Sequence, residues 1–181
     1  MRFAFSSVVK SVTRSFRIDD PLSKILDEEA DRMGISINAL VNIIIKQYLD
    51  FTRYLSKIDM VIINRELLTI LLESLEEKEI YDIAILFGST TPKDTILFWK
   101  KELSNHTVFE YLEKIVCRYG LLGTYDEIFQ NDTKTIVIRH RLGKKGSVFF
   151  DGYLKSTLKN TLGLDSSVEL TESSVKIQIK I

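Results

Sequence analysis

The chain has 181 residues, of which 45% are hydrophobic and 10% aromatic, and this composition argues against global disorder. Its 25 basic residues balance its 25 acidic residues, which argues against a protein that coats nucleic acid through overall charge. A local basic surface is still compatible with this balance, because binding depends on where the charges lie. The one cysteine, Cys117, cannot form an internal disulfide. The longest apolar runs are far shorter than the roughly 20 residues of a membrane span. We therefore expect a soluble, cytoplasmic protein without a membrane association.

The N-terminal residues predict an arm followed by a short strand. Residues 1–11 contain Arg2 and Lys10 but no acid, and we expect a flexible basic arm there. Residues 12–18 read Val-Thr-Arg-Ser-Phe-Arg-Ile, a near-alternating pattern that predicts a strand.

Two helices are expected after the strand. Asp20 is a good N-cap and Pro21 suits the first helical position, where its missing N–H has no effect. This helix runs to about Met33, and Gly34 supplies a left-handed C-cap. Ser36 caps a second helix with an apolar stripe.

The pattern changes past residue 56 and predicts a mixture of helices and strands. The expected elements are a β-like run at 60–63, a helix from a cap at Asn64 to about Glu77, an apolar segment at 80–87, a turn at 88–92, helices at 94–103 and 108–119, a strand at 134–142, a helix at 148–162 and a hairpin at 167–181 around Glu172 and Ser173. We therefore predict an α+β fold with a first domain at 1–56 and a larger α/β domain at 57–181.

The order of strand, capped helix, Met-Gly turn and capped helix within about 45 residues resembles the ribbon-helix-helix family of DNA-binding proteins. The resemblance covers residues 12–52 and depends most on the stretch 30–36, followed by 39–41 and 44–45. A single strand with two short helices cannot bury its own apolar faces, so the unit needs a partner. The resemblance implies a homodimer in which two strands pair into an antiparallel ribbon and four helices interlock.

The same resemblance implies that outward side chains of the ribbon read bases in the DNA major groove. The matching residues are Thr13, Ser15 and Arg17, and the Arg17 guanidinium suits guanine O6 and N7. Arg14 departs from the family pattern, because it falls on the inward face where an apolar residue is usual. It is expected either to contact a phosphate from the end of the ribbon or to indicate a strand register shifted by one residue.

Phosphate contacts are implied at the start of the second helix. Free backbone N–H groups at a helix N-terminus favour an anion, and the matching positions are Ser36, Ile37 and Asn38. Lys10 and Arg2 in the arm are expected to add contacts to the DNA backbone.

The C-terminal part contains one basic turn, Arg139 to Ser147, whose glycines leave two readings open. It forms either a solvated connection between strand and helix or a cradle for a phosphate or acidic ligand. From His140 onward, about 45 residues are also similar to small-molecule-binding sensor domains related to haem–nitric-oxide modules. His106, His140 and Cys117 are too far apart in sequence to predict a metal site, unless a dimer brings them together.

The sequence thus predicts a transcriptional regulator, a repressor that binds double-stranded DNA as a homodimer or tetramer. The larger domain is expected to add assembly contacts or to sense a small-molecule effector. No nucleophile with a base, no paired carboxylates and no cofactor motif are readable, so neither an enzyme nor a cofactor is expected. The alternative function is an antitoxin-like or protein-interaction module whose C-terminal domain binds a protein partner.

Overall fold

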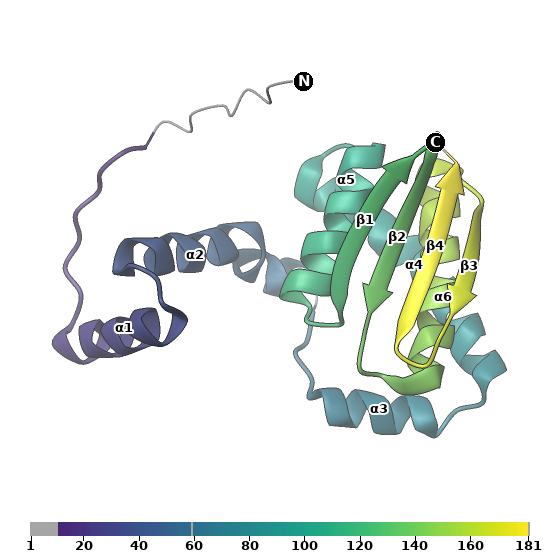
Figure 1. The fold of residues 1–181 in the computed structure, drawn as a ribbon, viewed down its shortest axis with the longest axis horizontal. Coiled ribbons are helices and arrows are strands. Elements are labelled where there is room, and N and C mark those ends of the chain that lie inside the picture. Colours follow the sequence, from purple (N-terminus) through teal and green to yellow (C-terminus); the bar gives the residue numbers. More distant parts are fainter. Residues whose placement is uncertain (1–10, 59, 181) are drawn as a thin grey trace. The chain divides into compact units, whose positions relative to one another are not determined.

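The computed structural model of the chain describes residues 11–58 and 60–180. The chain divides into two compact units between Tyr48 and Leu49 (Figure 1), and each unit is described by itself. The predicted domain boundary after residue 56 lies later in the chain and stays a prediction. The basic arm predicted at 1–11, with Arg2 and Lys10, lies almost wholly outside the described residues.

The first unit contains an extended segment and two helices, α1(Asp20–Met33) and α2(Ile37–Asp50), the second of which ends just past the division. Both predicted helices are confirmed. Gly34 has a φ of 65° and donates its N–H to the carbonyl of Asp31, which is the left-handed C-cap expected there. The N-cap of α1 is Asp19, one residue before the predicted cap.

The predicted strand at 12–18 is wrong. Residues 11–19 have no regular secondary structure, and all of them are exposed. An extended segment becomes a strand only when a second segment accepts and donates its backbone hydrogen bonds. The prediction assigned that role to the same strand of a second copy, and the described chain itself offers no pairing segment for residues 12–18.

The second unit is an α+β structure, which confirms the predicted fold class. Its elements are a 3₁₀ helix η1(Thr52–Lys57), α3(Arg65–Glu73), α4(Glu77–Lys100), α5(Asn105–Glu110), a π-helix η2(Tyr111–Tyr119), β1(Thr124–Gln130), β2(Thr133–Arg139), α6(Gly143–Leu162), β3(Ser166–Leu170) and β4(Ser174–Lys180). The four strands form one antiparallel sheet in the order β1-β2-β4-β3. The predicted strand, helix and hairpin at the end of the chain are confirmed, whereas β1 was not predicted.

Helices cover one face of the sheet (Figure 1). Ile136 and Ile138 of β2 and Ile177 of β4 point to this face and pack in one buried cluster with Phe150 and Leu154 of α6. The opposite face is polar, and it includes the ion pair between Lys176 and Glu169. The strands therefore alternate between core and solvent, as expected for an antiparallel sheet with one face exposed.

The predicted turn at 88–92 is wrong, because α4 continues through Gly88 and Pro92. Gly88 is buried where α4 crosses α6. A Cβ at this position would lie 2.7 Å from the carbonyl oxygen of Tyr153 and 2.9 Å from Cβ of Ser156. The glycine therefore permits close approach of two helices rather than a turn. Among the described helices, none is long and apolar enough to span a membrane.

The predicted cap at Asn64 is confirmed. Its side-chain oxygen accepts a hydrogen bond of 2.7 Å from the backbone N–H of Glu66 and so begins α3. The helix ends at Glu73, four positions before the predicted end at Glu77, which instead begins α4.

We expect Asn64→Ala to lower the free energy of unfolding of the second unit by about 1 kcal/mol, the usual effect of losing an N-cap. Asn64→Ser is the matched control, because a serine hydroxyl accepts the same hydrogen bond. Chemical denaturation followed by Trp99 fluorescence measures both variants. Equal losses in the two variants would show that the side-chain cap does not matter.

Candidate functional site

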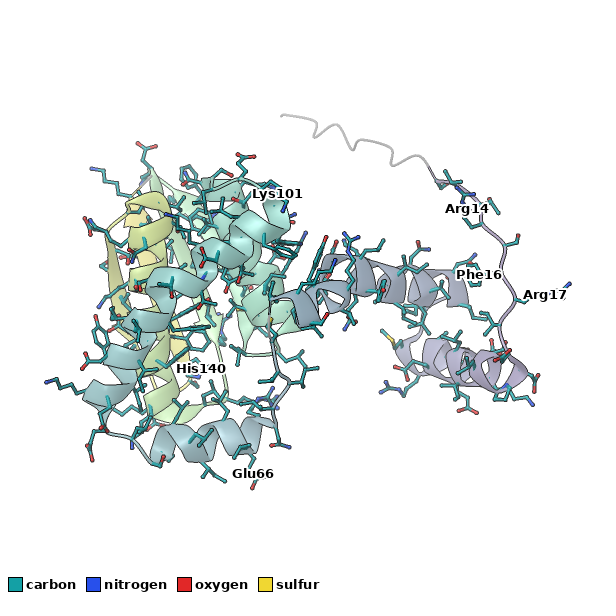
Figure 2. All side chains as sticks on the ribbon, turned by 180° about the vertical axis from the view of Figure 1, so that it is seen from behind. Arg14, Phe16, Arg17, Glu66, Lys101 and His140 are labelled. Atoms are coloured by element: carbon teal, nitrogen blue, oxygen red, sulfur yellow. The ribbon has the colours of Figure 1, made fainter. Side chains whose placement is uncertain are left out.

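The residues predicted to read bases lie on the extended segment of the first unit. Thr13, Ser15 and Arg17 are all exposed there, as is Arg14, and Figure 2 shows Arg14 and Arg17 on this segment. Lys10 lies outside the described residues. The segment forms no ribbon, so it does not place these side chains on one face of a sheet.

The residues predicted to bind phosphate lie at the start of α2. The Ser36 hydroxyl accepts a hydrogen bond of 3.2 Å from the backbone N–H of Ala39, which confirms it as a helix cap. Asn38 uses its backbone carbonyl to accept from the side chain of Asn42 at 2.7 Å. Ile37 is the first residue of the helix and is exposed. These positions are adjacent to one another but lie on a different element from Thr13, Ser15 and Arg17.

The lysines of the basic turn are engaged within the protein. Lys144 pairs with Glu77 at 2.7 Å. Lys145 donates to two backbone carbonyls, those of Glu73 at 2.8 Å and Leu75 at 2.6 Å. These two hydrogen bonds attach the last residue of α3 and the turn after it to α6. The structure therefore favours the first reading of this segment, a connection between strand and helix that also holds α3.

His140 lies at the centre of this connection and is 5% exposed (Figure 2). Its Nδ1 accepts a hydrogen bond of 3.3 Å from the backbone N–H of Leu142, so the ring proton belongs on Nε2. Nε2 then donates to the Ser147 hydroxyl at 2.9 Å, and that hydroxyl donates to the carbonyl of Thr171 at 2.6 Å. The ring also stacks on Phe150 with a centroid distance of 5.1 Å.

The backbone of His140 joins the same network, because its N–H donates to the carbonyl of Ser173 at 2.8 Å. One residue thus connects the end of β2, the first turn of α6 and the turn between β3 and β4. We call these three segments, with His140 and Ser147, the His140 junction. Burial lowers the pKa of His140 below its ordinary value of 6.5, so the ring is neutral at pH 7.

The other candidate metal ligands are elsewhere. His106 is exposed, with Nε2 3.8 Å from a carboxylate oxygen of Glu110. Cys117 is buried in η2, where burial raises the pKa of its thiol to about 12 and keeps it protonated. In residues 11–58 and 60–180 no three side chains of the metal-ligating types come together.

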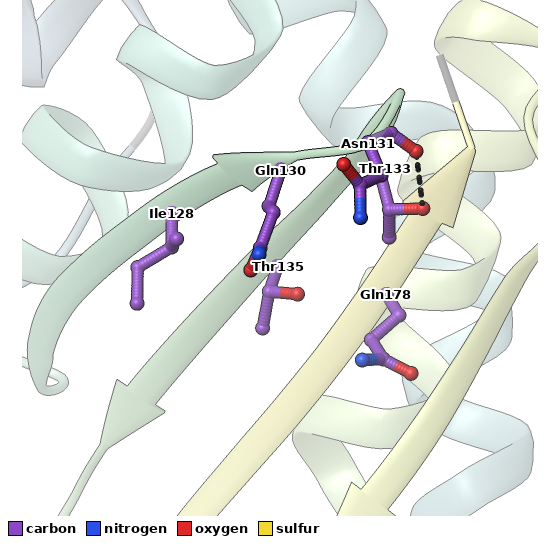
Figure 3. A pocket seen from close by; sticks show the side chains of 6 residues that line it. All are labelled: Ile128, Gln130, Asn131, Thr133, Thr135 and Gln178. Atoms are coloured by element: carbon purple, nitrogen blue, oxygen red, sulfur yellow. Dashed lines mark hydrogen bonds between the residues drawn. The ribbon is translucent and has the colours of Figure 1, made fainter.

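A shallow hollow lies on the exposed face of the sheet, at the turn between β1 and β2 (Figure 3). Its lining residues are Ile128, Gln130, Asn131, Thr133, Thr135 and Gln178. These side chains are neutral, and the Thr133 hydroxyl makes a long hydrogen bond of 3.5 Å to the carbonyl of Asn131. The hollow therefore offers no charged group to a ligand.

The largest apolar exposure in the second unit lies on α3 and the segment before it. Six side chains form this surface, which we call the α3 face: Val61, Ile62, Ile63, Leu67, Ile70 and Leu71. Val61 and Ile62 are 79% and 85% exposed, and Ile70 is 58% exposed. About half of the surface of Ile63, Leu67 and Leu71 is exposed as well. The β-like run predicted at 60–63 forms no strand.

A smaller apolar surface lies on α4. Ile83, Leu86 and Phe87 are exposed and follow helical spacing on one side of the helix. Phe87 is partly covered, because its ring stacks on Tyr153 at 5.6 Å. This surface is shorter than the α3 face and includes no extended segment.

The comparisons with known proteins give one informative result. Neither the family models nor the curated proteins produce a match. Among solved structures, a match is the crystal structure of a trafficking protein particle complex subunit 3 from Naegleria fowleri, covalently bound to palmitic acid. The two chains share 12% identity with a TM-score of 0.43, over 64% of this chain and 90% of that chain. The likeness is thus a distant one of shape.

These findings correct the predicted family. The strand at 12–18, which the resemblance requires for its ribbon, is not formed in the described chain, and the solved structure that matches is described as a subunit of a trafficking complex. The functions inferred from that resemblance are therefore withdrawn: a DNA-binding transcriptional repressor, double-stranded DNA as the partner, the ribbon-paired homodimer or tetramer, and an effector of that repressor. The DNA contacts of individual residues stay predictions, but the family resemblance that implied them no longer supports them.

Proposed function

We propose that this chain is a protein-interaction module whose second unit binds a protein partner through the α3 face. The observation that carries the proposal is the exposure of six large apolar side chains within eleven residues, three at Val61 to Ile63 and three at Leu67, Ile70 and Leu71. Isolated apolar side chains on a surface are ordinary, but large contiguous patches mark interaction sites. Burying such a patch against a partner stabilises the complex by roughly 25 cal/mol per Å² of apolar surface removed from water.

The shape of the surface suggests how a partner binds. On α3, Leu67, Ile70 and Leu71 follow the i, i+3, i+4 spacing of a helix that lies in an apolar groove. Glu66 lies along one side of this stripe, and Glu73, about two helical turns further on, lies on the same side and is 3.7 Å from Nζ of Lys145. We infer that the partner has an apolar groove with lysine or arginine on one side.

We propose binding rather than catalysis as the activity. A histidine hydrogen-bonded to a serine hydroxyl resembles part of a nucleophilic site, but His140 and Ser147 are both buried. The Ser147 hydroxyl also donates its proton to a backbone carbonyl, so it is engaged in holding the fold. Because a free cysteine persists in a reducing environment, we place this function in the cytoplasm.

Site-specific photo-crosslinking in cells of the source organism tests the proposal. We expect a photoreactive residue at position 62 or 70 to give a crosslinked adduct of one defined mass. Position 128 is the control, because Ile128 is 66% exposed but lies on the sheet and not on the α3 face. Introducing Ile70→Glu is expected to abolish the adduct formed from position 62, because it buries a charge in the interface.

Two results would contradict the proposal. Equal crosslinking from positions 62, 70 and 128 would indicate random collisions. An adduct from Leu86 on α4, with none from the α3 face, would place the partner on the other apolar surface.

A further inference from the structure

We propose that protonation of His140 opens the His140 junction and releases α3, so that the α3 face loses its binding geometry at mildly acidic pH. The effect on partner binding rests on the proposed function, because it assumes that the α3 face is the binding surface. The coupling between the junction and α3 is a property of the chain alone.

The first step is the loss of one hydrogen bond when the ring gains a proton. In the neutral ring Nδ1 accepts from the backbone N–H of Leu142. In the charged ring Nδ1 is a donor, so it faces another donor and the bond cannot form. The charge is also buried against Phe150, away from water.

The surroundings of His140 do not compensate for this charge. Several charged residues occupy the elements that pack around the ring: Arg139 and Arg141 beside it in the chain, Lys144 and Lys145 on α6, Glu172 in the turn between β3 and β4, and Glu73, Glu76 and Glu77 at the end of α3 and the start of α4. The four nearest in the chain are cations, which disfavour an imidazolium. None of the described carboxylates hydrogen-bonds to the ring, so the charged ring gains most by reaching water.

The second step connects the junction to α3 through the first turn of α6. Ser147 holds His140, and Lys145, two residues earlier, holds the carbonyls of Glu73 and Leu75. Lys144 of the same turn pairs with Glu77. Displacing this turn therefore removes the hydrogen bonds that close α3.

Apart from the hydrogen bonds of Lys145, α3 makes few contacts with the rest of the unit. It is therefore sensitive to the loss of those hydrogen bonds. Leu72 is the one buried residue of α3, and Leu68 is partly buried against the core. The element on which α3 mainly packs is α6, and at its first residue the Arg65 guanidinium donates to the carbonyl of Leu121 at 3.2 Å. When the first turn of α6 moves, we expect α3 to lose both its polar and its apolar support.

The direction of the pH effect follows from the pKa of His140. Burial holds that pKa below 6.5 in the closed junction, and opening returns it to the ordinary value. The open state thus binds the proton more tightly, so the closed state is stable at neutral pH and loses stability as the pH falls below about 6.5.

Amide hydrogen exchange of the purified full chain at pH 7.5 and 5.5 tests the coupling without any partner. After correction for intrinsic exchange rates, we expect residues 70–75 and residues 140–147 to exchange up to about tenfold faster at pH 5.5. Tenfold is the upper limit over this pH interval when the open junction titrates with the ordinary histidine pKa of about 6.5 and the closed junction stays neutral. His106→Gln is the control and should show the same increase, because His106 is exposed and outside the junction.

Two variants separate the steps. His140→Gln cannot acquire a charge and should exchange equally at the two pH values. Lys145→Met keeps the apolar stem but removes the donor, so residues 70–75 should exchange rapidly at both pH values while residues 140–147 stay pH-dependent. This second variant keeps the coupling testable if His140→Gln does not fold.

Three outcomes overturn the inference. The first is that both segments of the natural chain exchange at the same rate at pH 7.5 and pH 5.5. The second is that residues 140–147 exchange faster at pH 5.5 but residues 70–75 do not. The third is that the pH effect is still present in His140→Gln. Crosslinking from position 62 at the two pH values then tests the proposed function separately. If exchange changes as expected but no adduct forms at either pH, the coupling stands and the proposed binding surface is wrong.

Discussion

Phe150→Ala is expected to lower the free energy of unfolding of the second unit by about 3–5 kcal/mol. Phe150 is fully buried on α6, in the cluster that faces the sheet. Its ring stacks on His140 and meets Phe149 edge-on at 6.0 Å. Removing the ring therefore leaves a cavity between α6 and the sheet and also loses the stacking on the His140 junction.

Denaturation by urea, followed by Trp99 fluorescence, measures this loss. Phe129→Ala is the matched control, because Phe129 is exposed near the end of β1 and should change stability by less than about 0.5 kcal/mol. A loss in Phe150→Ala no larger than that of the control would mean that α6 does not pack on the sheet as described.

Gly88→Ala is expected to destabilise the second unit by about 1–3 kcal/mol, although helix propensity alone predicts the opposite sign. In an exposed helix, alanine is about 1 kcal/mol more favourable than glycine. At Gly88 the added methyl would lie 2.7 Å from the Tyr153 carbonyl oxygen, an atom of the α6 backbone that cannot rotate away. The steric cost of the methyl group between α4 and α6 therefore outweighs the gain in helix propensity.

Thr90→Ala provides the control for Gly88→Ala, because Thr90 is exposed two residues further along α4 and alanine there should be neutral or slightly stabilising. The same denaturation measurement applies to both variants. If Gly88→Ala also stabilised the protein, α4 and α6 would not be in close contact.

Local signals in the sequence predicted the helix ends well. Gly34 ends α1 in the left-handed conformation, and Asn64 begins α3 through its side chain. Both signals act within a few residues of backbone, so they do not depend on the rest of the fold. Element boundaries that depend on capping are therefore readable from sequence alone.

Signals that depend on distant contacts were misread. Gly88 and Pro92 predict a turn when only their neighbours are considered, but the reason for a glycine at position 88 is α6, far along the chain. The strand β1 was missed because it is an edge strand: Ile128 and Phe129 are both exposed, so no face of it is consistently apolar. Alternation at 12–18 predicted a strand for which the described chain offers no pairing partner.

The candidate site was predicted only in part. The basic turn with His140 was predicted to be either a connection between strand and helix or a cradle for an anion, and its partners Glu73, Leu75 and Thr171 come from other parts of the chain. Sequence spacing cannot show such contacts. The α3 face was missed for a different reason: apolar residues in a helix predict burial, and only the fold shows that Ile70 and Leu71 are exposed.

The contact between α4 and α6 has a consequence for synthesis of the chain. The hydrogen bond from the Ser156 hydroxyl to the carbonyl of Ile85 joins residues 71 positions apart. At about 5–20 residues per second, a ribosome needs on the order of several seconds to make the intervening segment. Throughout that interval the inner side of α4, with Ile80, Ala84 and Ile96, has no helix to cover it. The nascent chain therefore exposes the apolar side of α4 until α6 has emerged and can cover it.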